Sequence, residues 1–421
     1  MVTAAAQTLP KLRNICGAGG ARPAENRDRV GGVLPSYVAA VSTRPQLVSL
    51  MRFAATQNWT VVPRGGGSKL EWSGPVQSCD LVVDMSGMDS IIEHAPDDMI
   101  VRVQAGVTLA RLAEVLRDSN QQLALDTTSS GRSQCTPTVG GAIATGYGGP
   151  RRLRYGTASD LLLGMTIVRA DGVSAVSGSK VVKNVAGYDI AKLFTGAYGT
   201  LGIVAEATFR LHPLPAATRW VTAVPENPDI AGRFAREIAG GPWAPSAVEF
   251  KYDGERVELC TMVEGTHVGV AARADRIAQL CGGTCDTVPP RWFGAWHALE
   301  AMVLRVSCLP TRLPAALEAV RAVACDTEAS FVCTGGAALG SFLVSVTPST
   351  PQGNDRFVRT LRHALDQLKA RAVVTVAPAG DGLTEPRWGA IQPAVLRLMR
   401  RVKDQFDPEH RLSPGRFVGG M

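Results

Sequence analysis

The chain has 421 residues, of which 44 are lysine or arginine and 37 aspartate or glutamate, giving a formal net charge of +7. That length exceeds the roughly 300 residues that one hydrophobic core usually organises, so two domains are expected. Aromatic residues make up only 6%, and the absence of a long basic tract disfavours a nucleic-acid-binding protein. No apolar run approaches the roughly 20 residues of a membrane-spanning helix, and the N-terminus lacks a signal-peptide pattern. We therefore expect a cytoplasmic protein without a transmembrane segment.

The predicted elements of the first half mix strands and helices. Residues 1–30 are expected to form an N-terminal arm, either poorly ordered or a short helix. A capping hydroxyl, an early proline and apolar residues at helical spacing predict a helix from Ser42. Strands are predicted at 59–63, 80–86 and 99–106, and a helix begins at Thr108. Three more predicted strands cover 161–170, 173–178 and 199–211, and Asp171-Gly172 predicts a hairpin turn between the first two.

The proline-bearing stretch 213–228 predicts a domain boundary. Beyond it, a helix is predicted at 228–239, strands at 246–252 and 256–264, and a helix at 267–280. A similar alternation extends from 302 to 376. This order predicts an antiparallel sheet covered by helices, and hence an α+β domain.

Three glycine-rich segments lie in the first half. In the first, PRGGGSKL at 63–70, the lysine spacing does not fit a Walker phosphate loop, and no helix opens as a dinucleotide-binding Gly-x-Gly-x-x-Gly motif requires. Two interpretations remain for this stretch alone, namely a nest of backbone N–H groups around a phosphate or a surface turn. The second segment is TPTVGGAIATGYGG at 136–149 and the third is GAYGTLGIV at 196–204. Three such segments in one domain favour one extended ligand.

The three segments in this order, with KVVKNVAGYDIAKLF before the third, resemble the FAD-binding domain of the vanillyl-alcohol oxidase / p-cresol methylhydroxylase (PCMH) superfamily. The similarity is greatest to FAD-binding subunits of bacterial glycolate oxidases, which are akin to D-lactate and D-2-hydroxyglutarate dehydrogenases. The resemblance implies an α+β fold: a PCMH-type FAD-binding domain of two α/β subdomains at 31–213, and an α+β cap of antiparallel sheet and helices at 214–421. The ending FDPEHRLSPGRF also resembles the family, and the tail 406–417 is expected to pack back on the FAD domain.

The resemblance also implies the cofactor site. The amides of Gly65, Gly66, Gly67 and Ser68 would hold the FAD pyrophosphate, and Lys183–Asp189 would support the site. The full set of expected cofactor-binding residues is Pro63, Arg64, Gly65, Gly66, Gly67, Ser68, Lys69, Thr136, Thr138, Gly140, Gly141, Thr145, Gly148, Gly199, Gly202, Ile203 and Val204. Within it, the residues from 138 to 148 would line the pyrophosphate and isoalloxazine side, and those from 199 to 204 the ribityl–adenine side.

Two departures from the family pattern bear on the chemistry. None of the six histidines and no first-loop cysteine lies where relatives attach flavin covalently, so non-covalent FAD is expected. Relatives carry a Gly-Asp-Gly-Asn-x-His segment in the cap, whereas AGDGLTEPRWG at 379–389 keeps Asp381 and replaces Asn and His by Leu383 and Thr384. Metal sites need several ligands, so no metal is expected.

The expected function is oxidation of a 2-hydroxy acid as the FAD-binding subunit of a glycolate oxidase complex. A carboxylate substrate needs a cation; Arg387 and Arg151 are the chosen candidates, with Arg152 and Arg154 as alternatives. No catalytic base is evident, so little flavin reduction is expected from the isolated chain. None of the nine cysteines forms Cys-x-x-Cys, so electrons would leave through an iron–sulfur subunit beside a homologous larger flavin subunit, with membrane association only through such partners. A self-sufficient D-2-hydroxy-acid dehydrogenase and a non-catalytic FAD-carrying subunit are the alternatives.

Overall fold

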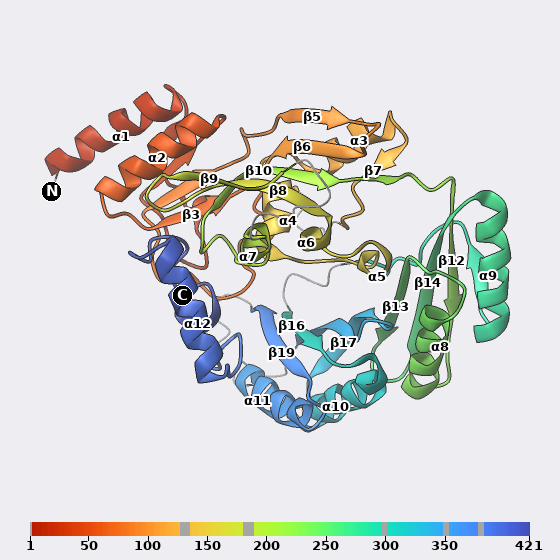
Figure 1. Ribbon diagram of the computed structural model, residues 1–421. Helices are drawn as coiled ribbons and strands as arrows, with labels where there is room; N and C mark the ends of the chain where they lie inside the picture. Colours follow the sequence, from red (N-terminus) through yellow and green to blue (C-terminus); the bar gives the residue numbers. More distant parts are fainter. Residues whose placement is uncertain (1, 127–134, 180–188, 296–300, 348–352, 378–382) are drawn as a thin grey trace.

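Three sheets of four or more strands organise the chain, two in its N-terminal half and one large sheet in its C-terminal half (Figure 1). The computed structural model describes residues 2–126, 135–179, 189–295, 301–347, 353–377 and 383–421. In Figure 1 the two N-terminal sheets lie above the large sheet, and the last helix, α12, lies beside both halves. The expected α+β class is confirmed.

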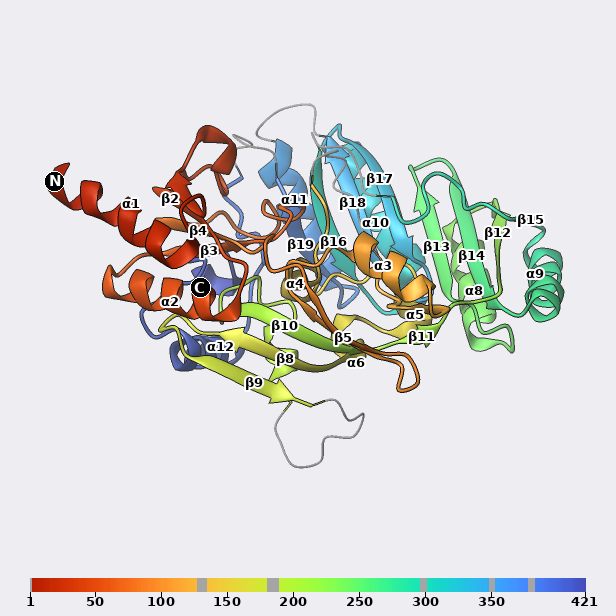
Figure 2. The same cartoon turned by 90° about the horizontal axis from the view of Figure 1, so that it is seen from above.

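The first sheet has four strands in the order β1-β2-β4-β3, with β2, β4 and β3 parallel and β1 antiparallel. Helices α1 and α2 lie side by side next to it (Figures 1 and 2). Helix α2 begins after Thr43, whose hydroxyl accepts a hydrogen bond from the Gln46 amide at 3.3 Å. The bounds are α1 Val2–Cys16, β1 Ala21–Pro23, β2 Tyr37–Ala40, α2 Arg44–Thr56, β3 Val61–Arg64 and β4 Leu81–Asp84.

The second sheet is antiparallel, with five strands in the order β5-β6-β10-β8-β9. The Asp171-Gly172 turn between β8 and β9 is confirmed, since Gly172 has a φ of 77° that favours glycine. The strands are β5 Ile91–Ala95, β6 Ile100–Gln104, β8 Leu162–Val168, β9 Ser174–Gly178 and β10 Ile203–Arg210, with a small pair of β7 Gln121–Gln122 and β11 His212–Pro213. The helices are α3 Leu109–Arg117, α4 Val139–Thr145, α5 Arg152–Tyr155, α6 Ala158–Leu161 and α7 Ala191–Phe194.

The C-terminal sheet has eight strands, all antiparallel, in the order β15-β12-β14-β13-β17-β18-β16-β19. Helices α8, α10 and α11 cover the face that points away from the N-terminal half (Figure 1). The strands are β12 Ala217–Ala223, β13 Ala247–Tyr252, β14 Val257–Gly265, β15 Thr284–Asp286, β16 Met302–Ser307, β17 Ser330–Gly336, β18 Ser341–Thr347 and β19 Arg371–Val376. The helices are α8 Pro228–Gly240, α9 His267–Cys281, α10 Leu313–Asp326, α11 Gly353–Asp366 and α12 Pro393–Phe406.

Two sequence expectations need refinement. The stretch 213–228, expected as a boundary, contains strand β12, which pairs with β14 over its whole length. Prolines lie on both sides of this strand, where they interrupt no hydrogen bonds between strands. The density of prolines made the whole stretch resemble a linker, although a strand lies between them. Of the two alternatives expected for the N-terminal arm, a poorly ordered segment or a short helix, the structure has the helix: the arm holds the 15-residue helix α1, followed by the strand β1.

The C-terminal tail returns from α12 to the N-terminal half. Leu412 forms a parallel bridge with Val61 of β3, and its side chain lies in the N-terminal hydrophobic core. Buried Lys403 of α12 pairs with Asp407 at 2.5 Å and donates to the Leu412 carbonyl oxygen at 3.1 Å. Asp407 also accepts the Leu412 amide at 2.7 Å. This polar cluster fixes the tail to α12 and holds Leu412 beside β3.

Candidate functional site

The glycine triplet after β3 is required by close packing against the second glycine-rich segment. A Cβ on Gly65 would lie 2.3 Å from the Thr138 hydroxyl, and one on Gly66 would lie 1.8 Å from the Thr136 carbonyl oxygen. Gly67 has a φ of 76°, which L side chains rarely adopt. No side chain larger than hydrogen therefore fits at these positions, and the backbone itself forms the wall of the neighbouring groove.

We define the dinucleotide groove as two adjoining pockets that share lining residues such as Gly65, Thr138 and Gly199 and that are lined by this loop, α4, the start of β10 and the tail. Its polar end lies at the loop, whereas Met85, Ala105, Phe194 and Val204 make its other end apolar. Helix α4 begins at Thr138, whose hydroxyl accepts the Gly141 amide at 3.3 Å. The lining includes these expected residues: Pro63, Arg64, Gly65, Gly66, Gly67, Ser68, Lys69, Thr138, Gly140, Gly141, Thr145, Gly199, Gly202, Ile203 and Val204.

Two of the expected cofactor-binding residues lie elsewhere. The carbonyl group of Thr136 packs against Gly66, and Thr136 does not line the groove. Gly148 follows α4 and lines a different pocket, described below. Of the segment Lys183–Asp189, only Asp189 belongs to the described residues, and it forms an exposed ion pair with Lys192.

Two cations, half-buried Lys69 and buried Arg416, line the polar end of the groove without a carboxylate partner among the described residues. Burial lowers the pKa of Lys69 to about 8, and its ammonium lies 5.5 Å from the centre of the Trp72 ring. Arg416, in the tail, is 5% exposed; it donates to the Leu70 carbonyl oxygen, and its Nε has no partner. Burial lowers its pKa to about 10. Unpaired buried charge is unfavourable, so this end of the groove suits an anion.

The charge of Arg64, in contrast, is neutralised by two carboxylates. Its guanidinium donates to Asp28 at 3.0 Å and to Asp84 at 2.8 Å, so it joins the first sheet to the segment before it. The cation that was not predicted, Arg416, comes from the end of the chain. Because 346 residues separate Arg416 from Leu70, no local pattern could place it at the groove. Its only sequence signal was the ending that resembles the family.

These observations fit the FAD that the sequence resemblance implies. Unpaired Lys69 and Arg416 and the glycine-bared backbone at 65–67 suit the diphosphate. The apolar end suits a flat ring. When bound, FAD supplies a two-electron acceptor.

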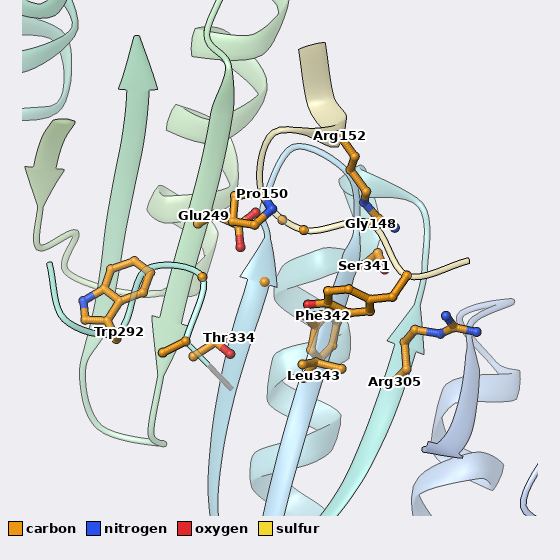
Figure 3. Close-up of a pocket in the computed structure, with 16 residues that line it drawn as sticks. Gly148, Pro150, Arg152, Glu249, Trp292, Arg305, Thr334, Ser341, Phe342 and Leu343 are labelled. Atoms are coloured by element: carbon orange, nitrogen blue, oxygen red, sulfur yellow. The ribbon is translucent and has the colours of Figure 1, made fainter. Parts of the chain in front are cut away.

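A second pocket lies where the N-terminal half meets the C-terminal sheet, and we call it the interdomain pocket (Figure 3). The segment 147–152, which directly follows α4, forms one wall, and strands β13, β16, β17 and β18 form the other. In strand β13, Val248 and Phe250 face the helix-covered core. Because strand side chains alternate between faces, Glu249 between them faces the pocket.

Three ionisable groups dominate the interdomain pocket. In Figure 3 the side chains of Arg152 and Arg305 lie on one side and Glu249 on the other. Burial lowers the pKa of Arg152, and the positive charge of Arg305 lowers it further. Burial raises the pKa of Glu249 to about 8, although Arg152 counteracts this rise. No ion pair joins either arginine to a carboxylate among the described residues. Two like charges in one pocket favour an anionic ligand.

The two arginines chosen from the sequence do not enter this pocket. Arg151 pairs with Asp126 at 2.6 Å and donates to Gln122 at 2.7 Å, so its charge is neutralised beside the pocket. Arg387 donates to the Ser73 carbonyl oxygen at 2.9 Å, near the tail. Of the alternatives, Arg152 lines the pocket, whereas Arg154 contacts Ser246 and lies outside it.

Sequence reasoning missed Glu249 and Arg305. Each was predicted within an antiparallel strand, where a charged residue between apolar ones usually faces solvent. No local pattern indicated that the N-terminal half covers that face. Asp381 lies outside the described residues, and Thr384 is bound to Asp355 through its amide at 2.8 Å. Among the described residues, no three His, Cys, Asp or Glu side chains are grouped to hold a metal ion.

None of the helices in the described ranges combines the length and apolar character needed to cross a membrane. Comparison with known families matches residues 35–176 to the FAD binding domain and residues 387–417 to the C-terminal domain of FAD linked oxidases. The second match contains both Arg387 and Arg416.

Three curated relatives are similar to the chain. Glycolate oxidase subunit GlcD of Bacillus subtilis is 31% identical over 217 residues, which cover 52% of this chain and 45% of that protein, less than half its length. Glycolate oxidase subunit GlcE of Escherichia coli is 30% identical over 172 residues, covering 41% of this chain and 48% of that protein. D-2-hydroxyglutarate dehydrogenase of Xanthomonas citri is 32% identical over 431 residues, covering 91% of this chain and 89% of the relative.

Among solved structures, an alkyldihydroxyacetonephosphate synthase matches with a TM-score of 0.69 at 16% identity, covering 91% of this chain and 78% of the other. At that identity the match supports the fold. The full-length similarity to the Xanthomonas citri enzyme, the two domain matches and the dinucleotide groove agree on the FAD cofactor and the family. The chain belongs to the FAD-linked oxidases with a PCMH-type FAD domain.

Proposed function

We propose that this chain oxidises a small 2-hydroxy acid to the corresponding 2-oxo acid with non-covalently bound FAD, as a flavin subunit of a glycolate oxidase-type complex. One observation carries the proposal: Arg152 and Arg305 line the interdomain pocket together, unpaired with any carboxylate among the described residues. Paired guanidinium groups are the usual means of binding a carboxylate.

The position of the pocket along the chain supports the same reaction. Helix α4 lines the dinucleotide groove, and the pocket-lining segment 147–152 begins two residues after that helix ends at Thr145. A ligand held by the two arginines would therefore lie near the C-terminal end of α4. Trp292 and Leu343 add apolar walls, which exclude water and strengthen the charge interactions.

The pocket changes the expectation for the isolated chain. The sequence offered no proton acceptor, so little reduction of the flavin was expected. With Glu249 in the pocket, we now expect the isolated holoprotein to reduce its own flavin. Sustained turnover would still need an acceptor, which we propose to be an iron–sulfur subunit beside a larger flavin subunit. The similarity to both GlcD and GlcE supports this subunit role.

The test is anaerobic rapid mixing of the holoprotein with glycolate, D-lactate and D-2-hydroxyglutarate, following loss of flavin absorbance. We expect reduction with at least one acid and none with the corresponding amide, which lacks the carboxylate. Arg305→Met should weaken the apparent affinity for the acid by about 10- to 150-fold, as expected for a lost charge-assisted contact of about 1.5–3 kcal/mol. Arg154→Gln, outside the pocket, is the matched control.

The outcome that contradicts the proposal is an unreduced flavin with every acid, together with equal affinity of the parent and Arg305→Met for an unreactive carboxylate such as oxalate. Turnover with a soluble electron acceptor at the rate of flavin reduction would favour the self-sufficient dehydrogenase. Restoration of turnover only by the partner subunits would favour the complex.

A further inference from the structure

Glu249 differs from two neighbouring glutamates of the C-terminal sheet, buried Glu264 and half-buried Glu258. Its side chain is 8% exposed, and none of the hydrogen bonds or ion pairs among the described residues involves its carboxyl group. Glu264, 2% exposed on β14, accepts a hydrogen bond from the Tyr155 hydroxyl at 3.0 Å. Glu258 accepts one from Trp292 at 3.1 Å. A buried carboxyl group without such a partner is unfavourable for the fold, so its retention in the pocket needs another explanation.

The backbone gives Glu249 a fixed position. Strand β13 is an interior strand, paired with Cys260 on β14 and with Gly336 on β17 at the level of Glu249. A Cβ on Gly336 would lie 3.4 Å from the Glu249 Oε1. The carboxyl group therefore lies over a glycine, and the Leu339 side chain, 3.1 Å from the same Cβ position, leaves no room for a side chain there. A site on the interior of a sheet holds its geometry more closely than one on a loop.

We propose that Glu249 is the catalytic proton acceptor for the substrate hydroxyl group, while Arg152 and Arg305 hold the substrate carboxylate on the other side of the pocket. The inference rests on the proposed oxidation of a 2-hydroxy acid. In that oxidation the O–H proton passes to the Glu249 carboxylate, the C–H hydrogen leaves with its electron pair to FAD, and the C–O bond becomes C=O. The substrate is oxidised by two electrons and the cofactor is reduced by two.

The charges around Glu249 set the expected pH dependence. Tyr147 and Arg152 face it from the segment 147–152, Asp126 from the segment before it, Cys260 from β14, and Arg305 lies across the pocket on β16. Desolvation is the largest influence and raises the pKa to about 8. Below that pH the group is neutral and cannot accept a proton. Flavin reduction should therefore become faster as the pH rises through about 8.

Anion binding should show the opposite trend. An unreactive carboxylate such as oxalate meets a neutral Glu249 at low pH and a negative one at high pH, so its affinity should fall through the same range. Because oxalate can be followed by its perturbation of the flavin spectrum without any reaction, this readout does not depend on turnover. In Glu249→Gln the affinity should be independent of pH between 6 and 9, since the carboxyl group is gone.

The decisive experiment measures both quantities in the holoprotein for the parent, Glu249→Gln, Glu249→Asp and the matched control Glu264→Gln. In Glu249→Gln, reduction should slow by about 10²- to 10⁴-fold, the usual contribution of a general base, and its rise with pH should vanish. Glu249→Asp should retain the pH dependence with a smaller loss. Glu264→Gln should keep both profiles.

The outcomes separate this proposal from the proposed function. A parent that no 2-hydroxy acid reduces would refute the function. A parent that is reduced, with Glu249→Gln reduced equally fast or with an unchanged pH profile, would refute the role of Glu249 alone. Glu249→Gln replaces one carboxyl oxygen by an NH2 group of similar size and cannot carry a negative charge. Retained oxalate binding would therefore show that the variant is folded and that any lost reduction has a chemical cause.

Discussion

Replacing Arg416 by methionine should weaken FAD binding without destabilising the empty protein. In the absence of an anion the guanidinium is buried and lacks a carboxylate partner within the described residues. Its pKa falls to about 10 from an ordinary value above 12, and at about 1.4 kcal/mol per pKa unit the charge destabilises the empty site by about 3 kcal/mol. Methionine removes that penalty and keeps much of the apolar stem.

The FAD-bound protein should respond in the opposite direction. The diphosphate pairs with the guanidinium, and loss of one charge-assisted contact of about 1.5–3 kcal/mol corresponds to about 10- to 150-fold weaker binding. Arg416→Lys keeps the charge and should fall between the parent and Arg416→Met. Arg411→Met is the matched control, because Arg411 is a buried arginine of the same tail that does not line the groove.

The assay is titration of the apoprotein with FAD, followed by quenching of flavin fluorescence, together with thermal unfolding of the apoprotein. We expect a higher dissociation constant for Arg416→Met, and an unfolding temperature equal to or above that of the parent. An unchanged dissociation constant would refute the assignment of Arg416 to the diphosphate. Weaker binding with an equal loss of apoprotein stability would instead show that Arg416 only supports the tail.

Three further predictions concern the groove and the tail. Gly66→Val should abolish FAD binding, as measured by the flavin content of the purified protein, because a Cβ would lie 1.8 Å from the Thr136 carbonyl oxygen; a normal flavin content would show that the loop is only a turn. Acid or heat should release all flavin into solution, and fluorescence remaining with the denatured chain on a gel would point to Cys135, whose Sγ lies 3.9 Å from a Cβ built on Gly67. Lys403→Met should lower the free energy of unfolding in urea by about 3–5 kcal/mol, because it leaves a buried carboxylate unpaired, and adding Asp407→Asn should recover part of that loss; an unchanged midpoint for the single variant would contradict the role of the pair.

Local structure and family membership could both be predicted from the amino-acid sequence. Capping residues such as Thr108, the Asp171-Gly172 turn and the alternation in residues 246–252 depend on neighbours within a few positions, so they can be predicted without knowing the fold. For the same reason, the glycine triplet predicted a segment whose backbone is not covered by side chains. Its partner, the second glycine segment, was recognisable because both segments belong to one family pattern.

The tertiary structure alone decided which charges are available to a ligand. Arg151 and Arg152 are adjacent and chemically identical, yet Asp126 neutralises the first while the second enters the interdomain pocket. Glu249 lies on the face of its sheet opposite the core covered by α8, α10 and α11. That face is buried only because the N-terminal half packs against it. Arg416 reaches the groove because the tail folds back across the whole chain. Desolvation and charge pairing depend on contacts between residues far apart in sequence, and such contacts leave no local signal.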